Sequence, residues 1–137
     1  MNELIQGRAI VAGEAEGPLL VSATPLSFWG AYDPATGEII DRRHPLSGRI
    51  AAGCVLVLPG TIGSSTTTAV LLEAVRRGTA PSAILTSEAD TFLALASIVA
   101  GEMYGRSFPV VVLDADQFTK LSGTNRVQVH SDGVVLT

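Results

Sequence analysis

The segment CVLVLPGTIGSSTTTAVLLEAVRRG, residues 54–78, decides the fold of this chain. Its first five residues form an unbroken apolar run, which is typical of a strand that is buried on both faces. A helix is predicted from Ser64 or Ser65 to about Arg77, where a pair of cations precedes Gly78, a common helix stop. The segment therefore predicts a strand, a turn and a helix in direct succession.

The same pattern continues further along the chain. A second strand is expected at Ser82–Thr86 and a third at Pro109–Leu113. Between them a helix is predicted to end near Tyr104, with Ser87 as its N-cap and Asp90 three residues later. Strands that alternate with helices in this order form parallel sheets with right-handed crossovers.

The flanking segments are expected to add antiparallel strands. These are Leu4–Val11 and Gly17–Ser22 near the start of the chain, and a hairpin of Arg126–His130 with Gly133–Leu136 at its end. A chain of 137 residues has the size of one domain. Residues 1–137 are therefore predicted to form a single mixed α/β domain with two main helices.

The spacing of apolar residues predicts the buried face of each helix. Leu71, Ala74 and Val75 share one face of the first helix because they lie three and four positions apart. In the second helix the corresponding face consists of Phe92, Leu95, Ala96 and Val99.

The composition excludes several classes of protein. The net charge is −4 and no basic run is longer than a pair, so binding to nucleic acid is not expected. The apolar runs are far shorter than the ~18 residues that span a bilayer, so no membrane partner is predicted. Residues 1–8 lack a signal-peptide pattern, and a cytoplasmic location is therefore predicted. Only 16% of the residues are charged, which indicates either a surface covered by a partner or an unusually apolar monomer.

The turn after the first buried strand is the sharpest candidate site. All six residues from Gly63 to Thr68 are glycine, serine or threonine. The free N–H groups and dipole of a helix start, together with these hydroxyls, suit a carboxylate or a phosphate, or lower the pKa of a hydroxyl. Simple capping of the helix is the alternative. A Walker A loop is excluded because no Lys follows Gly63. A dinucleotide-binding turn is excluded because Gly60 and Gly63 are only three residues apart.

The histidines and the cysteine give weaker signals. His44 and His130 lack ligand-like spacing, so neither a metal site nor a Ser-His-Asp arrangement is predicted. His44 is expected to be solvated in its loop, with a substrate or interface role left open, and His130 is expected to be structural. Cys54, the only cysteine, is interpreted as a small core residue, and it excludes an internal disulfide and a cysteine-only cluster site in this chain.

The long connection Ala23–Ser47 has poor periodicity. Loops of this length in a compact domain are usually functional or interfacial. Its aromatic residues Phe28, Trp29 and Tyr32 suit a core or an interface, and the proline-rich context favours an interface. A short strand is also predicted at Glu38–Asp41.

An ordered set of motifs extends over nearly the whole chain, namely Gly13–Val21, Pro25–Phe28, Gly30, Asp33–Gly37, Ile40–Asp41, His44, Val55–Leu58, Gly63-Ser64, Arg77-Gly78 and Phe108–Val111. In this order they resemble the small subunit of the aconitase X group, also described as the phosphomevalonate dehydratase small subunit in archaea. The resemblance implies a swivelling β/β/α domain with a mixed sheet and a barrel-like β core, similar to the mobile C-terminal domain of aconitases.

The resemblance also implies a chemistry. In aconitases a Gly-Ser-Ser turn before a helix delivers a serine that removes the substrate proton as an alkoxide. The match here is Gly63-Ser64-Ser65, with Ser64 as the catalytic base and Gly63, Ser65 and Thr66 as substrate-binding residues. The implied partner is a large catalytic subunit of aconitase X type, in a heterodimer, that holds an iron–sulfur cluster, and this chain is expected to bind no metal.

Two departures from the family pattern bear on the substrate. Aconitases have an Arg where Thr66 stands, so citrate-like substrates are disfavoured. Archaeal phosphomevalonate dehydratases usually have a basic residue where Ile62 stands, which removes one phosphate contact here. The expected function is therefore dehydration of cis-3-hydroxy-L-proline, a small hydroxy imino acid, and dehydration of phosphomevalonate is the alternative.

Two other classes of function compete with a dehydratase subunit. A phosphohistidine carrier domain shares the swivelling fold but needs a histidine in the turn, where Ser64 and Ser65 stand. A non-catalytic interaction domain built on the aromatic loop would form a complex whose activity does not depend on Ser64.

Overall fold

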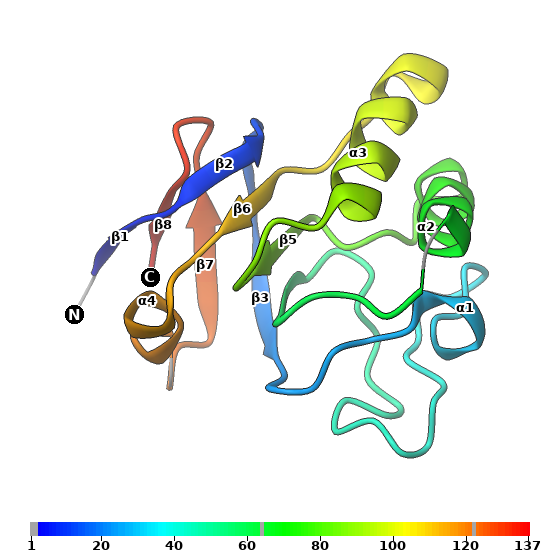
Figure 1. Ribbon diagram of the computed structural model, residues 1–137, viewed down its shortest axis with the longest axis horizontal. Helices are drawn as coiled ribbons and strands as arrows, with labels where there is room; N and C mark the ends of the chain where they lie inside the picture. Colours follow the sequence, from blue (N-terminus) through cyan, green and yellow to red (C-terminus); the bar gives the residue numbers. More distant parts are fainter. Residues whose placement is uncertain (1–2, 64, 122) are drawn as a thin grey trace.

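The computed structural model describes residues 3–63, 65–121 and 123–137. Its elements are, in chain order, β1 (Leu4–Gln6), β2 (Arg8–Val11), β3 (Ala15–Val21), α1 (Phe28–Ala31), β4 (Val55–Leu58), α2 (Ser65–Arg77), β5 (Ala83–Thr86), α3 (Thr91–Tyr104), β6 (Val110–Val112), α4 (Ala115–Thr119), β7 (Arg126–Val129) and β8 (Val134–Leu136). The strands form one mixed sheet in the order β1-β8-β7-β3-β4-β5-β6-β2, and α2 and α3 lie side by side next to it (Figure 1). Within these ranges no helix combines the length and apolar character needed to cross a bilayer.

The sheet closes on itself because its first strand bends. The predicted strand Leu4–Val11 divides at Gly7 into β1, which is antiparallel to β8, and β2, which is antiparallel to β6. Since β1 and β2 are the two ends of the strand order, one bent segment joins both edges into a barrel. A Cβ atom at Gly7 would lie 2.5 Å from Cγ1 of Val111 and 2.7 Å from Cδ2 of Leu113, so a larger residue at the bend would require these core side chains to move.

Strand β3 links the antiparallel and the parallel parts of the sheet. Its first half pairs with β7 in antiparallel fashion and its second half pairs with β4 in parallel. Strands β4, β5 and β6 are mutually parallel, as the alternation of strands and helices predicts. Every residue of β4 and β5 is buried, because the barrel lies on one side of these strands and the helices on the other. The barrel interior is filled by Ile5, Val55, Val57, Ala83, Leu85, Val111, Leu113, Leu121, Val127, Val129 and Val135, which confirms the predicted barrel-like core.

Helix α2 buries the face that the sequence predicts, whereas α3 does not. Leu71, Ala74 and Val75 of α2 are all buried. In α3, Leu95 of the predicted face is 43% exposed, and Leu93 is fully buried instead. Of the predicted face of α3 only Ala96 is therefore confirmed as buried: the buried residues are Leu93, Ala96, Ser97 and Ala100.

Polar contacts explain this orientation of α3. The Ser97 hydroxyl donates to the carbonyl oxygen of Phe108 and accepts from the N–H of the same residue at 3.0 Å. Both groups are buried, so these hydrogen bonds fix the face of α3 against the segment that precedes β6. A periodicity argument counts only apolar side chains and therefore misses a serine in the core.

The C-terminal end of α2 is fixed by its own neighbours in sequence. The N–H groups of Gly78 and Thr79 donate to the carbonyl oxygens of Val75 and Ala74 at 3.1 and 2.8 Å. This is a Schellman motif, and Gly78 has the positive φ of +77° that the motif requires. The sequence predicted this stop correctly.

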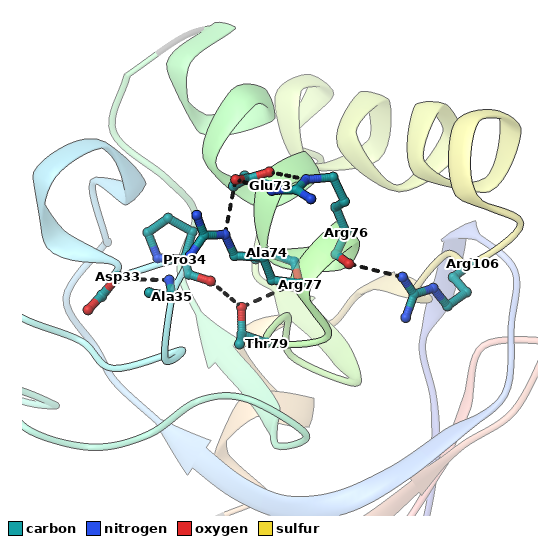
Figure 2. Close-up of polar contacts among 9 residues, drawn as sticks. All are labelled: Asp33, Pro34, Ala35, Glu73, Ala74, Arg76, Arg77, Thr79 and Arg106. Carbon is teal, nitrogen blue, oxygen red and sulfur yellow. Dashed lines mark hydrogen bonds and ion pairs between the residues drawn. The ribbon is translucent and has the colours of Figure 1, made fainter.

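Figure 2 shows the charged contacts at this end of α2. Glu73 accepts hydrogen bonds from Arg76 at 2.6 and 2.8 Å and from Arg77 at 3.0 Å. The hydrogen bonds from Arg76, followed by those from Arg77 and by both charges, outweigh desolvation and lower the pKa of Glu73 to about 2. Thr79 Oγ1 donates to the Pro34 carbonyl at 2.6 Å, which ties the helix end to the long loop (Figure 2).

The short helix α4 is absent from the prediction, because five residues are too few for a periodicity signal. It begins with a capping box: Asp114 Oδ1 accepts from the Gln117 N–H at 2.8 Å, and Gln117 Oε1 accepts from the Asp114 N–H at 2.9 Å. Leu121, just after the helix, is 1% exposed and packs into the barrel core. The segment from α4 to Leu121 therefore covers part of the barrel, away from α2 and α3 (Figure 1).

Candidate functional site

The turn between β4 and α2 lies at the carboxyl ends of the parallel strands. Strands β3 to β6 run in the same direction, so the segments that follow β4 and β5 emerge at the same edge of the sheet. Ligands of parallel α/β sheets bind at this edge. A pocket of about 280 Å³ opens there, lined by Pro59, Gly60, Thr61, Gly63, Glu88, Ala89, Asp90, Thr91 and Phe92.

Three of the four predicted site residues meet at the start of α2. Gly63 has a φ of +116°, a conformation that residues with side chains rarely adopt. Ser65 and Thr66 are the first two residues of α2, and both are exposed. The predicted base, Ser64, lies outside the described residues. The structure thus places Gly63, Ser65 and Thr66 on an accessible helix start beside the pocket.

The helix start is electrostatically positive. The first turn of α2, over its described residues, contains no acidic side chain that would offset the helix dipole. The described lining of the pocket includes the carboxylates of Glu88 and Asp90 but no Arg, Lys or His. This arrangement can stabilise an oxyanion at the helix start, but it supplies no cation for a phosphate.

Asp90 joins the starts of both helices. Its Oδ1 atom accepts from the N–H groups of Phe92 and Leu93 at 3.1 and 3.2 Å, which makes Asp90 the N-cap of α3. Its Oδ2 atom accepts from the N–H and the hydroxyl of Thr61 at 3.0 and 2.5 Å. The prediction of Ser87 as the N-cap is therefore wrong, because α3 begins at Thr91 and Asp90 is the residue directly before it.

Ser87 instead holds the turn. Its N–H and its hydroxyl donate to the carbonyl oxygen of Pro59 at 3.3 and 3.0 Å. One helical turn beyond the start of α2, Thr68 Oγ1 donates to the carbonyl oxygen of Phe92 at 3.0 Å. The loop between β5 and α3 thus contacts the β4–α2 segment on both sides of Gly63.

A second segment supports the turn from the opposite side. The N–H of Leu26 donates to the carbonyl oxygen of Gly60 at 3.3 Å, and the N–H of Ile62 donates to the carbonyl oxygen of Leu26 at 3.1 Å. These bonds form a parallel bridge between Leu26 and Thr61. Sequence reasoning missed these contacts, although successive turns of a parallel sheet are expected to meet at one edge.

The aromatic residues of the long loop divide between core and surface. Phe28 and Tyr32 are buried with their ring centroids 5.2 Å apart, and the Tyr32 hydroxyl donates to the Thr79 carbonyl at 2.6 Å. Burial raises the pKa of Tyr32 well above its usual range. Trp29 is 68% exposed, so among the three it alone is accessible to a partner. The predicted strand at Glu38–Asp41 is reduced to isolated bridges.

The histidines are structural. His44 is 6% exposed, so the prediction of a solvated loop histidine is wrong. Its Nδ1 accepts from the Leu46 N–H at 3.1 Å and its Nε2 lies 3.2 Å from the carbonyl oxygen of Thr24, which fixes the loop. His130 lies at a strand end, with Nδ1 3.6 Å from Oε1 of Glu14.

Neither the cysteine nor any acidic cluster provides a metal site. Cys54 is partly buried and packs against the core between the sheet and the helices. Over residues 3–63, 65–121 and 123–137, no group of three or more His, Cys, Asp or Glu side chains could hold a metal ion. A single cysteine in the whole sequence also does not fit an iron–sulfur cluster.

Comparison with known proteins agrees with the fold. Over 136 residues the chain is 47% identical to cis-3-hydroxy-L-proline dehydratase of Pseudomonas aeruginosa, a match that covers 94% of this chain and 23% of that protein. It is 41% identical to the enzyme of the same name from Hypocrea jecorina, covering 97% of this chain and 22% of that protein. The chain therefore spans about a quarter of the length of these relatives.

Other relatives have nearly the length of this chain. The phosphomevalonate dehydratase small subunit of Thermococcus onnurineus is 38% identical over 128 residues, covering 93% of this chain and 92% of that protein. The crystal structure of Thermococcus kodakaraensis aconitase X in its holo form superposes with a TM-score of 0.82 at 34% identity, covering 97% of this chain and 96% of that one. Residues 4–137 match the family described as the aconitase X swivel domain, and the chain belongs to that family.

Proposed function

We propose that this chain is the swivel-domain subunit of an aconitase X-type dehydratase, with Ser64 as the base that removes the substrate proton. One observation carries the proposal: the Gly63-Ser64-Ser65 motif coincides with a positive, accessible helix start beside a pocket at the carboxyl edge of the sheet.

The environment suits an activated serine. The pKa of a free serine hydroxyl lies far above neutrality, so the alkoxide needs strong local stabilisation. The N-terminal end of α2 supplies unpaired N–H groups and a positive potential there. The exposed hydroxyls of Ser65 and Thr66 are available to donate to a substrate carboxylate. Gly63, with its positive φ, makes the turn that leads into the helix.

For the substrate we favour cis-3-hydroxy-L-proline. The two relatives that carry this name are 47% and 41% identical to this chain. Ile62, at the position before Gly63, is 57% exposed and apolar, and the described lining of the pocket contains no cation that could pair with a phosphate. The carboxylates of Glu88 and Asp90 instead give the pocket a potential that favours the ammonium group of an amino acid. Phosphomevalonate is the second candidate, because the small subunits of that name match this chain over nearly their whole length.

The reaction requires a partner. The resemblance to aconitase X implies an iron–sulfur cluster, and the residues of this chain do not fit one, so we assign the cluster to a large catalytic subunit. Trp29 and Ile62 are 68% and 57% exposed, and they belong to segments joined by the Leu26–Thr61 bridge next to the site. Closure of a partner over this apolar surface would also exclude water from the serine.

The test is reconstitution. The chain is co-expressed with a large subunit of aconitase X type, purified under anaerobic conditions, and assayed with cis-3-hydroxy-L-proline and phosphomevalonate in parallel. We expect kcat/KM to favour the imino acid by at least about 100-fold, as for a site that leaves a phosphate without a cation. A preference for phosphomevalonate would overturn the substrate assignment, and turnover of neither compound by a cluster-loaded complex would overturn the proposed function.

A further inference from the structure

The two carboxylate oxygens of Asp90 accept hydrogen bonds from two different segments of the chain. Oδ1 caps α3, as N-cap residues do, and one oxygen is sufficient for that purpose. Oδ2 receives two hydrogen bonds from Thr61, a residue of the neighbouring turn that lies 29 positions earlier in the chain. Hydrogen bonds to an ionised acceptor are stronger than those between neutral groups. The two hydrogen bonds from Thr61 to Oδ2 are not needed to cap α3.

The turn that Asp90 holds has little rigidity of its own. Thr61 lies between Gly60 and Gly63, and glycine gives the backbone more freedom than any other residue. On one side the turn is fixed through the backbone of Leu26. On the other side the contacts to Thr61 come from Asp90, whose own position is set by α3. Ser87 holds the start of the turn at Pro59, and Asp90 holds Thr61, the residue two positions before Gly63, so the place at which the chain passes Gly63 depends in part on this carboxylate.

We infer that Asp90 is a positioning residue for the dehydration: through Oδ2 and Thr61 it sets where Gly63 and the start of α2 at Ser65 stand relative to the substrate. This inference rests on the proposed role of Ser64. Misplacement of a catalytic group by about 1 Å can reduce the rate about 100-fold. The hydrogen bonds between Thr61 and Asp90 can therefore affect turnover without touching the substrate. Asp90 itself transfers no proton in this scheme.

The substitution D90N separates the two tasks of the carboxylate. An asparagine keeps an oxygen that can cap α3, but its amide nitrogen cannot accept a hydrogen bond from the Thr61 N–H. Asp114, the N-cap of α4, is the matched control, because D114N makes the same chemical change in a capping box away from the site. In the reconstituted complex we expect kcat of D90N to fall by about 10- to 100-fold with KM within about threefold of wild type, and D114N to stay within about twofold in both parameters.

A second pair of variants covers the case in which D90N does not fold. T61V removes the hydroxyl that donates to Oδ2, whereas T61S keeps it. T61V is expected to lower kcat by about tenfold, and T61S, which keeps the hydroxyl, to lower it clearly less than T61V does. Unchanged kcat in both D90N and T61V, or equal losses in D90N and D114N, or equal losses in T61V and T61S, would overturn the inference.

A readout that does not depend on turnover separates this inference from the proposed function. Amide hydrogen exchange at Thr61 and Gly63 is measured by NMR on the full chain, with D114N as the control. Loss of the contact to Oδ2 is expected to accelerate exchange at Thr61 in D90N by at least about tenfold and to leave D114N unchanged there. Unchanged exchange at Thr61 in D90N would overturn the inference, even if the wild-type complex proved to be inactive on both substrates.

Discussion

The two ends of helix α2 are held in different ways. At the C-terminal end, the side chain of Glu73 and the N–H groups of Gly78 and Thr79 make their contacts with residues a few positions away, and the Thr79 hydroxyl adds one distant contact, to Pro34. At the N-terminal end, the turn that leads into the helix is held by Leu26, Ser87 and Asp90, from distant parts of the chain. The first end stabilises the helix and the second positions a reactive group. Substitutions at the two ends should therefore separate stability from activity.

The largest effect is expected from S64A at the N-terminal end. Loss of an essential base should reduce kcat by at least about 10,000-fold in the reconstituted complex. The accompanying loss of stability should be no more than about 1 kcal/mol, the usual cost of removing a helix cap. An exposed serine outside the site, Ser107, provides the control S107A. Turnover retained in S64A would remove the role assigned to Ser64 and would favour an interaction domain.

G78A at the C-terminal end should show the opposite behaviour. Gly78 has a φ of +77° and no atom within 4 Å of an added Cβ, so the substitution strains the backbone without a steric clash. We expect the free energy of unfolding to fall by about 1 kcal/mol, measured by urea denaturation, with unchanged kcat. The matched control is G101A inside α3, where φ is not positive and an added Cβ would be 3.6 Å from Ser107, an ordinary contact. If G101A lowered the free energy of unfolding as much as G78A, the loss in G78A could not be attributed to the positive φ of Gly78.

The smallest effect is expected from E73Q, and it should depend on pH. Glu73 has a pKa of about 2 in the folded chain, against an ordinary value of 4.5. A carboxyl with a lowered pKa contributes stability that is present above the unfolded pKa and is lost as the pH falls toward the folded value. Wild type should therefore be more stable than E73Q at about pH 6, and the difference should shrink between about pH 4.5 and pH 2.

Because this pair is on the surface, salt should weaken its contribution. Urea denaturation of both proteins at several pH values and two salt concentrations measures the difference. A difference that grows as the pH falls would contradict the assignment of the lowered pKa to the arginine contacts.

The sequence anticipated the features that depend on near neighbours. The buried strands β4 and β5 follow from continuous apolar runs, and the buried face of α2 follows from the spacing of Leu71, Ala74 and Val75. It failed where a polar group has a distant partner. The orientation of α3 depends on Ser97 and Phe108, the burial of His44 on Thr24, and the cap of α3 on a carboxylate that also binds Thr61.

The candidate site shows the same division. The motif Gly63-Ser64-Ser65 and its place before a helix are visible in the sequence. The pocket beside it is not, because its other wall, Glu88–Phe92, comes from the next strand-to-helix connection. Only the parallel pairing of β4 with β5 brings the two walls together.

The sequence by itself determined the alternation of the central strands with the two main helices, the end of α2 at Gly78 and the presence of a serine at a helix start. These follow from side-chain periodicity and backbone preference, which act over a few residues. The tertiary structure alone decided the closure of the barrel at Gly7 and the hydrogen bonding of Thr61 to Asp90. In both cases a short local segment is compatible with several conformations, and one of them is selected by packing or by a hydrogen bond from a distant part of the chain.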